Sequence, residues 1–280
     1  MKISFIVLTY NRADALLAVL SSLASQCGTA HEVLIADDGS RPDQVRMLHE
    51  HCPFFHCPVR HVWHPDTGFT AARARNLAAS HASGDYLIFL DGDCVPNKAF
   101  VAEHTRLAEA GCFLNGSRVL LSDRLTRQVL DGELNLPMLP ATFWWQAWMA
   151  GDSNKLLHLF TWPWRVFRVK QKFVWRGIRS CNFAVWQSDF ANVNGFDETF
   201  EGWGHEDADL VLRLHHLGIL RKNGFMATEV FHLWHRENKR NQESVNKNRV
   251  LRRMQTHLVQ AEQGLREIES EQTVQITQLN

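Results

Sequence analysis

The chain has 280 residues, enough for one large α/β domain or two small ones with a substantial core. It holds 30 Lys plus Arg against 30 Asp plus Glu, so its overall charge indicates neither a nucleic-acid partner nor a strongly basic one. No apolar run approaches the ~20 residues of a membrane-spanning helix, and six irregularly spaced cysteines without a secretory signal predict reduced thiols in the cytoplasm.

Strands and helices alternate through the first third of the chain. We expect strands at 3–9, 32–36, 59–63 and up to Asp91, and helices at 12–25, 42–51 and 70–81. This alternation predicts a parallel sheet with helices on both faces, in which ligands bind at the carboxyl ends of the strands. Polar motifs follow three of these strands, namely Thr9-Tyr10-Asn11, Asp37-Asp38 and Asp91-Gly92-Asp93. They predict one shared cleft.

The second half of the chain has a less regular pattern. We expect a helix at 97–110, strands at 115–121, 180–186 and 229–231, and a helix at 205–217. Leu251, Met254, Leu258, Ala261, Leu265 and Ile268 follow one another at steps of three and four, which predicts a helical tail. This tail is either a helix docked on the domain or a short dimer contact.

Residues 137–176 interleave tryptophans with lysines and arginines. One interpretation is a loop that closes over the cleft and forms the acceptor site. Another is a patch that lies on the inner face of a membrane, with aromatic rings at the headgroup level and cations against anionic lipid. The plain alternative is the core of a small subdomain.

Asp91 and Asp93 are two positions apart at a strand end, a spacing that points both carboxylates to one face. His232 and His235 follow the last expected strand, and imidazole is a common metal ligand. We therefore predict a divalent cation held by Asp93 and His235, with His232 as a further ligand. The alternative interpretation is a solvated turn and surface histidines.

The segment from Gly202 to Asp209 (GWGHEDAD) places three acids at the start of the helix expected at 205–217. Asp207 lies where the helix dipole stabilises an anion, as a general base for a sugar hydroxyl requires. Glu206 and Asp209 are then free to hold acceptor hydroxyls or to start the helix. Upstream, Arg75 lies near the start of another expected helix, where an arginine can meet a diphosphate.

Several of these motifs occur together, and in the same order, in a known family. The N-terminal ones are Ile6 to Arg12 (IVLTYNR), Asp37-Asp38-Gly39-Ser40, Ala74-Arg75-Asn76 and Phe89 to Asp93 (FLDGD). They resemble the nucleotide-sugar half of glycosyltransferase family 2. Asn194-Gly195-Phe196-Asp197 followed by Gly202 to Asp207 resembles the acceptor half shared by β-1,4-galactosyltransferases and bacterial chondroitin-type polymerases. The resemblance covers about residues 3–240.

The resemblance implies a GT-A fold, an α/β architecture with a Rossmann-like nucleotide-binding sheet and a mixed acceptor-side sheet. A single domain would then span 1–240, with a nucleotide-sugar half at 1–115 and an acceptor half at 116–240. The Trp-rich insert 137–176 lies inside the acceptor half, and a C-terminal helix follows at 241–280.

The resemblance also implies roles for individual positions. Nucleotide and donor binding fall to Thr9, Tyr10, Asn11, Arg12, Asp37, Asp38, Arg75, Asp91, Gly92 and Trp203. Asp93, His235 and His232 are the implied ligands of Mn²⁺ or Mg²⁺, although the galactosyltransferases have a methionine where this chain has His232. Asp207 is the implied catalytic base, with Glu206 beside it.

These expectations describe an inverting, metal-dependent transferase. It moves one hexose or N-acetylhexosamine from a UDP-linked sugar to a hydroxyl of a glycan or glycolipid, in cell-envelope polysaccharide or lipopolysaccharide synthesis. The chain has one set of donor-binding motifs, whereas the polymerases have two catalytic halves. We therefore expect it to add single sugars rather than to alternate two. Two rival interpretations are a non-catalytic sugar-binding module and a sugar nucleotidyltransferase, whose Gly-rich loop is replaced here by residues 9–12.

Overall fold

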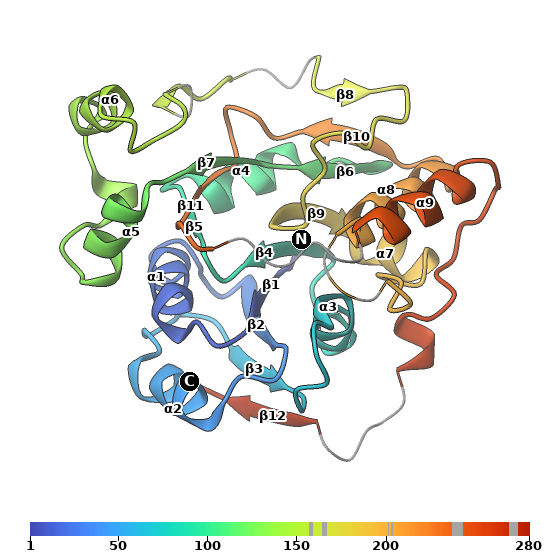
Figure 1. The fold of residues 1–280 in the computed structure, drawn as a ribbon, viewed down its shortest axis with the longest axis horizontal. Coiled ribbons are helices and arrows are strands. Elements are labelled where there is room, and N and C mark those ends of the chain that lie inside the picture. The colour runs from blue at the N-terminus through green and yellow to red at the C-terminus, as the bar shows by residue number, and fades with distance from the viewer. Residues whose placement is uncertain (157–158, 164–166, 201, 203, 237–242, 269–273) are drawn as a thin grey trace.

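The computed structural model describes residues 1–156, 159–163, 167–200, 202, 204–236, 243–268 and 274–280. Within these ranges one large mixed sheet and one small sheet form the centre of the molecule (Figure 1). In spatial order, the large sheet contains β12 (Gln275–Gln278), β3 (Val59–Trp63), β2 (His31–Asp37), β1 (Ile3–Thr9), β4 (Tyr86–Asp91), β9 (Asn182–Trp186), β6 (Cys112–Asn115), β10 (Leu220–Asn223) and β8 (Val169–Lys170). The small sheet contains β5 (Cys94–Pro96), β11 (Glu229–His232) and β7 (Ser117–Leu120).

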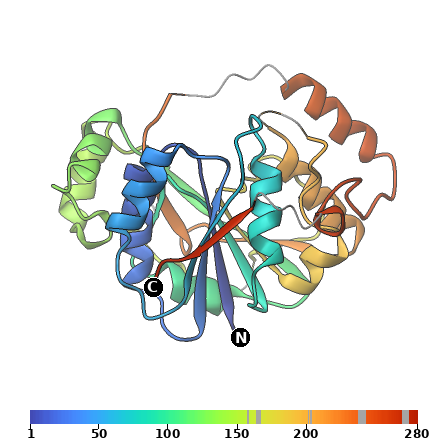
Figure 2. The same ribbon diagram turned by 90° about the horizontal axis from the view of Figure 1, so that it is seen from below.

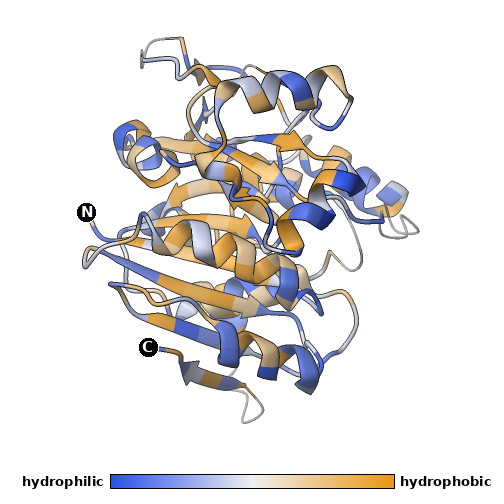
Figure 3. Ribbon diagram, turned by 90° about the vertical axis from the view of Figure 1, so that its left-hand side faces the viewer, coloured by the Kyte–Doolittle hydropathy of each residue, from blue (hydrophilic) through white to orange (hydrophobic). Residues whose placement is uncertain are grey.

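Helices cover both faces of the large sheet (Figure 2). The helices of the described residues are α1 (Ala13–Ala24), α2 (Pro42–His51), α3 (Ala71–Ser80), α4 (Phe100–Leu107), α5 (Asp123–Leu130), α6 (Ala141–Met149), α7 (Gln187–Asn192), α8 (Glu206–His216) and α9 (Glu243–Arg253). Successive side chains of β1 point to opposite faces, so Phe5 and Val7 pack in the α1 core while Ile6 packs in the core beneath α3 and α8. Hydrophobic residues concentrate in the strands between these layers (Figure 3).

The expected alternation of the N-terminal third is confirmed. β3, β2, β1 and β4 pair in parallel, and each expected helix of this region forms within one or two residues of its expected ends. The helix expected at 97–110 is shorter and spans only Phe100–Leu107.

The strand expected at 115–121 is divided at Gly116. β6 ends before it in the large sheet, and β7 begins after it in the small sheet. A Cβ atom at Gly116 would lie 2.1 Å from the Asn182 side chain, so only glycine fits at this crossing. The Asn182 amide donates to the Ser117 and Thr228 carbonyls, which ties the two sheets together.

The expectation of a helix through the whole C-terminal tail is wrong in the described residues. α9 ends at Arg253 and docks on α8, with Val250 fully buried near Leu212. Leu265 and Ile268 pack instead against the core beneath α3. The chain then adds β12 antiparallel to the edge of β3. No α-helix in the described ranges combines the length and the apolar character needed to cross a bilayer.

Candidate functional site

The carboxyl ends of β1, β2 and β4 lie side by side, because the strand register pairs Thr9 with Asp37 and Leu8 with Asp91. Asn11, in the loop after β1, has a left-handed φ of 50°, and its backbone N–H donates to Ser40 Oγ at 2.8 Å. The structure thus brings the three predicted N-terminal motifs to one edge of the sheet.

The two aspartates after β2 are buried and point in different directions. Asp37 accepts hydrogen bonds from the Ser40 backbone N–H at 2.8 Å and pairs with His61 Nε2 at 2.9 Å. Asp38 accepts from the Thr70 backbone N–H at 3.0 Å and from Thr70 Oγ1 at 2.5 Å. Asp38 therefore fixes the start of α3, the helix that carries Arg75.

Other predicted nucleotide-side residues surround this edge. Thr9 is buried, and its carbonyl accepts the Asp38 backbone N–H. Tyr10 is half-exposed and donates its hydroxyl to Asp66 at 2.9 Å, a bond that raises the pKa of the phenol. Arg12 pairs with Asp14 at 2.9 Å, and its charge also acts on His235.

Asp93, His232 and His235 converge at the turn between β4 and β5. His235 Nε2 lies 3.2 Å from one Asp93 oxygen and His232 Nε2 lies 3.8 Å from the other. The Leu233 backbone N–H donates to the Asp93 carbonyl at 2.9 Å, which anchors the histidine segment to this turn. Gly92 allows the turn, since a Cβ there would lie 2.7 Å from the Leu8 carbonyl.

The electrostatics of this cluster favour an ionised carboxylate. Burial raises the pKa of Asp93, but the hydrogen bond from His235 and the charges of both histidines outweigh it and hold that pKa below its ordinary value. Burial lowers the pKa of His232, so its neutral, ligand-competent form is favoured. The cluster fits a divalent cation, because carboxylate and imidazole are suitable ligands for Mn²⁺ and related ions.

Arg75 joins the two halves of the site. It is only 3% exposed, and its Nη2 donates to Asp91 at 2.8 Å while its Nη1 lies 3.5 Å from Glu206. Its guanidinium also lies 5.4 Å from the centre of the Phe196 ring. Arg75 was expected to reach the base or the diphosphate, and here its charge is shared between two carboxylates.

Asp207 lies in the first turn of α8, behind a left-handed backbone at His205 (φ 73°). Burial and the neighbouring Glu206 charge raise its pKa to about 7, against opposing contributions from the Ala208 and Ser180 N–H groups and Arg75. The start of α8 was expected to keep Asp207 anionic. Its N–H group does favour the anion, but burial and the Glu206 charge outweigh this effect, so the net shift of the pKa is upward. A pKa near neutrality suits a general base.

Asp209, expected either to hold acceptor hydroxyls or to start the helix, has a structural role. It is fully buried and bonds Arg213 at 2.7 Å and Arg253 at 2.6 Å. This network fastens α9 to α8. Trp203, predicted to meet the sugars, lies outside the described residues.

Sequence reasoning missed several neighbours of the site. Cys94 offers its sulfur within the same cluster as Asp93 and His232, and burial raises the pKa of this thiol. Arg179 directly precedes Ser180, whose backbone N–H bonds Asp207. No spacing rule identifies either contact, since both depend on strands brought together from distant parts of the chain.

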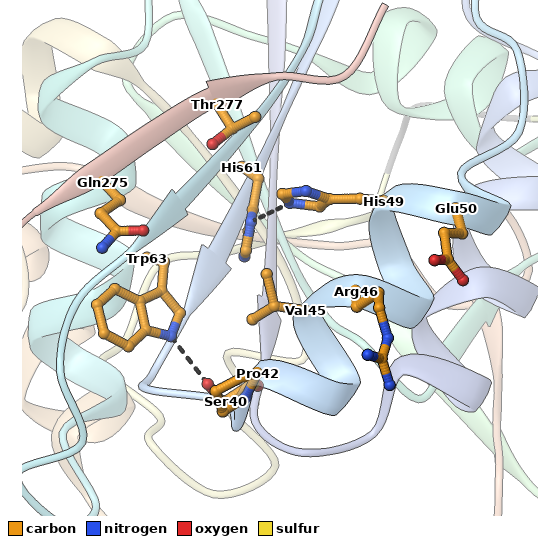
Figure 4. Close-up of a pocket in the computed structure, with 10 residues that line it drawn as sticks. All are labelled: Ser40, Pro42, Val45, Arg46, His49, Glu50, His61, Trp63, Gln275 and Thr277. Carbon is orange, nitrogen blue, oxygen red and sulfur yellow. Dashed lines mark hydrogen bonds between the residues drawn. The ribbon is translucent and has the colours of Figure 1, made fainter.

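A cavity of about 600 Å³ lies near the β12 edge of the large sheet, between α2, β3 and β12 (Figure 4). His49 Nε2 and His61 Nδ1 are 2.9 Å apart in its wall, and His61 contacts Asp37 behind them. Trp63 donates its indole N–H to the Ser40 carbonyl at 3.0 Å. Of the predicted site residues that the structure describes, none lines this cavity.

Comparison with known proteins gives consistent matches along the chain. A family model for glycosyl transferase family 2 matches residues 4–150, and a model described as the N-terminal domain of galactosyltransferase matches 166–236. A validoxylamine A glucosyltransferase of Streptomyces hygroscopicus subsp. jinggangensis is 30% identical over 246 residues, or 78% of this chain and 52% of that protein. The chondroitin synthase of Escherichia coli is 26% identical over 257 residues, or 84% of this chain and 34% of that protein. The chain thus spans about half the length, or less, of these relatives.

Solved structures match at the level of the fold. S. aureus TarS 1–349 in complex with UDP-GlcNAc aligns with a TM-score of 0.59 and 15% identity, covering 95% of this chain and 69% of that one. The mannosyltransferase PcManGT from Pyrobaculum calidifontis, in complex with GDP-Man and Mn²⁺, aligns with a TM-score of 0.54 and 15% identity, covering 89% and 61%. Both likenesses support the expected GT-A fold.

Proposed function

This chain belongs to glycosyltransferase family 2, and from that premise we propose that it transfers a single hexose or N-acetylhexosamine from a UDP-linked donor, with inversion at the anomeric carbon. The observation that carries the proposal is the convergence of Asp93, His235, Arg75 and Asp207 around the ends of β1 and β4. The two family matches lie within the proposed transferase segment 1–240, and the tail from Glu243 packs on this segment through α9 and β12.

Asp93, His235 and His232 are the proposed ligands of Mn²⁺ or Mg²⁺. Cys94 is not included, because its raised pKa keeps the thiol protonated and sulfur ligands suit softer cations than Mn²⁺ or Mg²⁺. When bound, the ion neutralises charge on the donor diphosphate. The Mn²⁺ in the PcManGT complex supports this assignment.

Asp207 is the proposed general base. The acceptor hydroxyl attacks the anomeric carbon on the face opposite the nucleoside diphosphate, the C–O bond to the diphosphate breaks, and Asp207 takes the hydroxyl proton. Arg75 holds Glu206 and Asp91, so the carboxylate beside Asp207 stays in place. One base and one displacement give inversion.

The proposed acceptor is a hydroxyl of a glycan or glycolipid of the cell envelope. The chondroitin synthase among the relatives supports a glycan acceptor. The Trp-rich insert supports a contact with the inner face of a membrane. In α6, Trp144 is buried against Phe231, whereas Trp145 and Trp148 are 56% and 45% exposed. Such aromatic side chains partition to the headgroup level.

The test is a thermal-shift panel of UDP- and GDP-sugars with and without Mn²⁺, followed by measurement of UDP release. We expect one UDP-sugar to raise the melting temperature only with the ion, since a ligand at 100 times its Kd adds about 2.7 kcal/mol. Asp93→Ala should abolish the ion-dependent shift, whereas the exposed Asp131→Ala should retain it. A wild-type chain that binds no nucleotide sugar, or an Asp93→Ala variant with a normal shift, contradicts the proposal.

A further inference from the structure

Three cations of the acceptor half lie around the junction of β6 and β7. Lys155 Nζ donates to the Arg118 carbonyl at 2.8 Å and to Ser117 Oγ at 3.2 Å, so the insert places its ammonium group on β7. The Arg179 backbone N–H donates to Asn115 Oδ1 at 3.3 Å, at the end of β6 just before Gly116 and β7. We call Arg118, Lys155 and Arg179 the cation cluster.

The cluster extends from the proposed metal ligands to the proposed base. β7 pairs in parallel with β11, which ends at His232, and the charge of Arg118 acts on that histidine. At the other end, the charge of Asp207 acts on Arg179. An anion bound at the Arg179 end of the cluster would therefore lie within electrostatic range of Asp207.

The cluster has more positive charge than its surroundings neutralise. In the described part of the chain, no carboxylate forms an ion pair with Arg118, Lys155 or Arg179, and the buried Nε of Arg118 has no hydrogen-bond partner. Burial and the Arg179 charge lower the pKa of Lys155, while partial burial and the Arg118 charge lower that of Arg179. Glu229 and Asp207 are the acids whose charges act on these cations, and burial raises the pKa of each to about 7. The positive charges of these three side chains repel one another unless a bound anion neutralises them.

We propose that the acceptor carries an anionic group, a carboxylate or a phosphate, and that the cation cluster binds it beside the attacking hydroxyl. Guanidinium groups match both anions through paired N–H donors, and an ammonium adds a point charge. All three cations belong to the acceptor half, and none lies on the strand ends of the nucleotide half. This inference rests on the proposed function and specifies its acceptor.

The test measures binding of two matched probe pairs to the full chain in the presence of UDP and Mn²⁺, by NMR titration. One pair is p-nitrophenyl β-D-glucuronide and p-nitrophenyl β-D-glucoside, and the other is glycerol 3-phosphate and glycerol. We expect at least one anionic probe to bind about tenfold more tightly than its neutral partner, and the preferred pair distinguishes carboxylate from phosphate. Raising the salt concentration should reduce this preference, because the cluster is partly open to solvent.

Arg118→Gln and Arg179→Gln should each lose most of this preference, whereas Arg118→Lys should keep part of it. Lys170→Gln is the control, because it removes an exposed cation of β8 that is outside the cation cluster. UDP affinity with Mn²⁺ should be unchanged in every variant, which also shows that each one folds. Normal UDP binding without any anion preference overturns this inference alone. A loss of UDP affinity in the glutamine variants also overturns it, since the cations would then serve the donor diphosphate. Failure of the wild type to bind UDP overturns the proposed function as well.

Discussion

Replacing Asp207 by asparagine tests whether this side chain is kept for transfer at the expense of stability. The carboxyl is buried beside Glu206, and its pKa is raised from 3.8 to about 7. At about 1.4 kcal/mol per pKa unit, ionised Asp207 destabilises the fold by up to about 4 kcal/mol. Asparagine has nearly the same shape and carries no charge.

The stability difference should depend on pH in a defined direction. The pKa of Asp207 is higher in the folded state than in the unfolded state. The wild type therefore has its full free energy of unfolding below pH 3.8, where Asp207 is protonated in both states, and loses part of it as the pH rises through about 7. Asp207→Asn should therefore be more stable than the wild type by up to about 4 kcal/mol at pH 8 and by about 2 kcal/mol at pH 5.5. The difference should vanish below pH 4. Urea unfolding at these pH values measures it.

Transfer should change in the opposite direction. Loss of a general base costs about 10²–10⁴ in rate, while UDP binding with Mn²⁺ should be retained. Wild-type turnover should fall as the pH drops below about 7, because Asp207 becomes protonated. Asp131→Asn, at an exposed position, is the control for both measurements. Near-normal turnover of Asp207→Asn, or a stability gain that is the same at every pH, would refute the reasoning.

Two further predictions concern Arg75, which lies between Asp91 and Glu206, and the exposed tryptophans of α6. Arg75→Met leaves Asp91 and Glu206 facing each other without a cation, so it should lower the free energy of unfolding in urea by about 3–5 kcal/mol. Arg127→Met, which removes an exposed pair, should cost less than about 1 kcal/mol, and equal losses would contradict the assignment. The double variant Trp145→Ser and Trp148→Ser should bind anionic vesicles more weakly in sedimentation while its UDP affinity is unchanged. Unaltered vesicle binding would exclude α6 as the contact.

The sequence was sufficient where the relevant signal is local. β1, β2 and β4 were predicted within one or two residues, because short β-rich apolar runs are followed by turn residues. The sequence-based prediction failed where apolar residues at helical spacing do not form a helix. Leu265 and Ile268 continue a helical spacing, yet Gly264 lies so close to the Asn194 carbonyl that a Cβ would be 1.9 Å from it, and the chain turns there.

The same distinction applies to the candidate site. The motif order alone determined the family, the fold class and the residues at the strand ends, because turn chemistry and strand termini are encoded in contiguous residues. Only the tertiary structure decided that Arg75 lies between Asp91 and Glu206 and that Asp209 is a buried anchor for α9. Only the structure decided the pKa of Asp207, too. Burial and long-range charge pairing depend on which distant segments pack together, and no spacing along the chain specifies that.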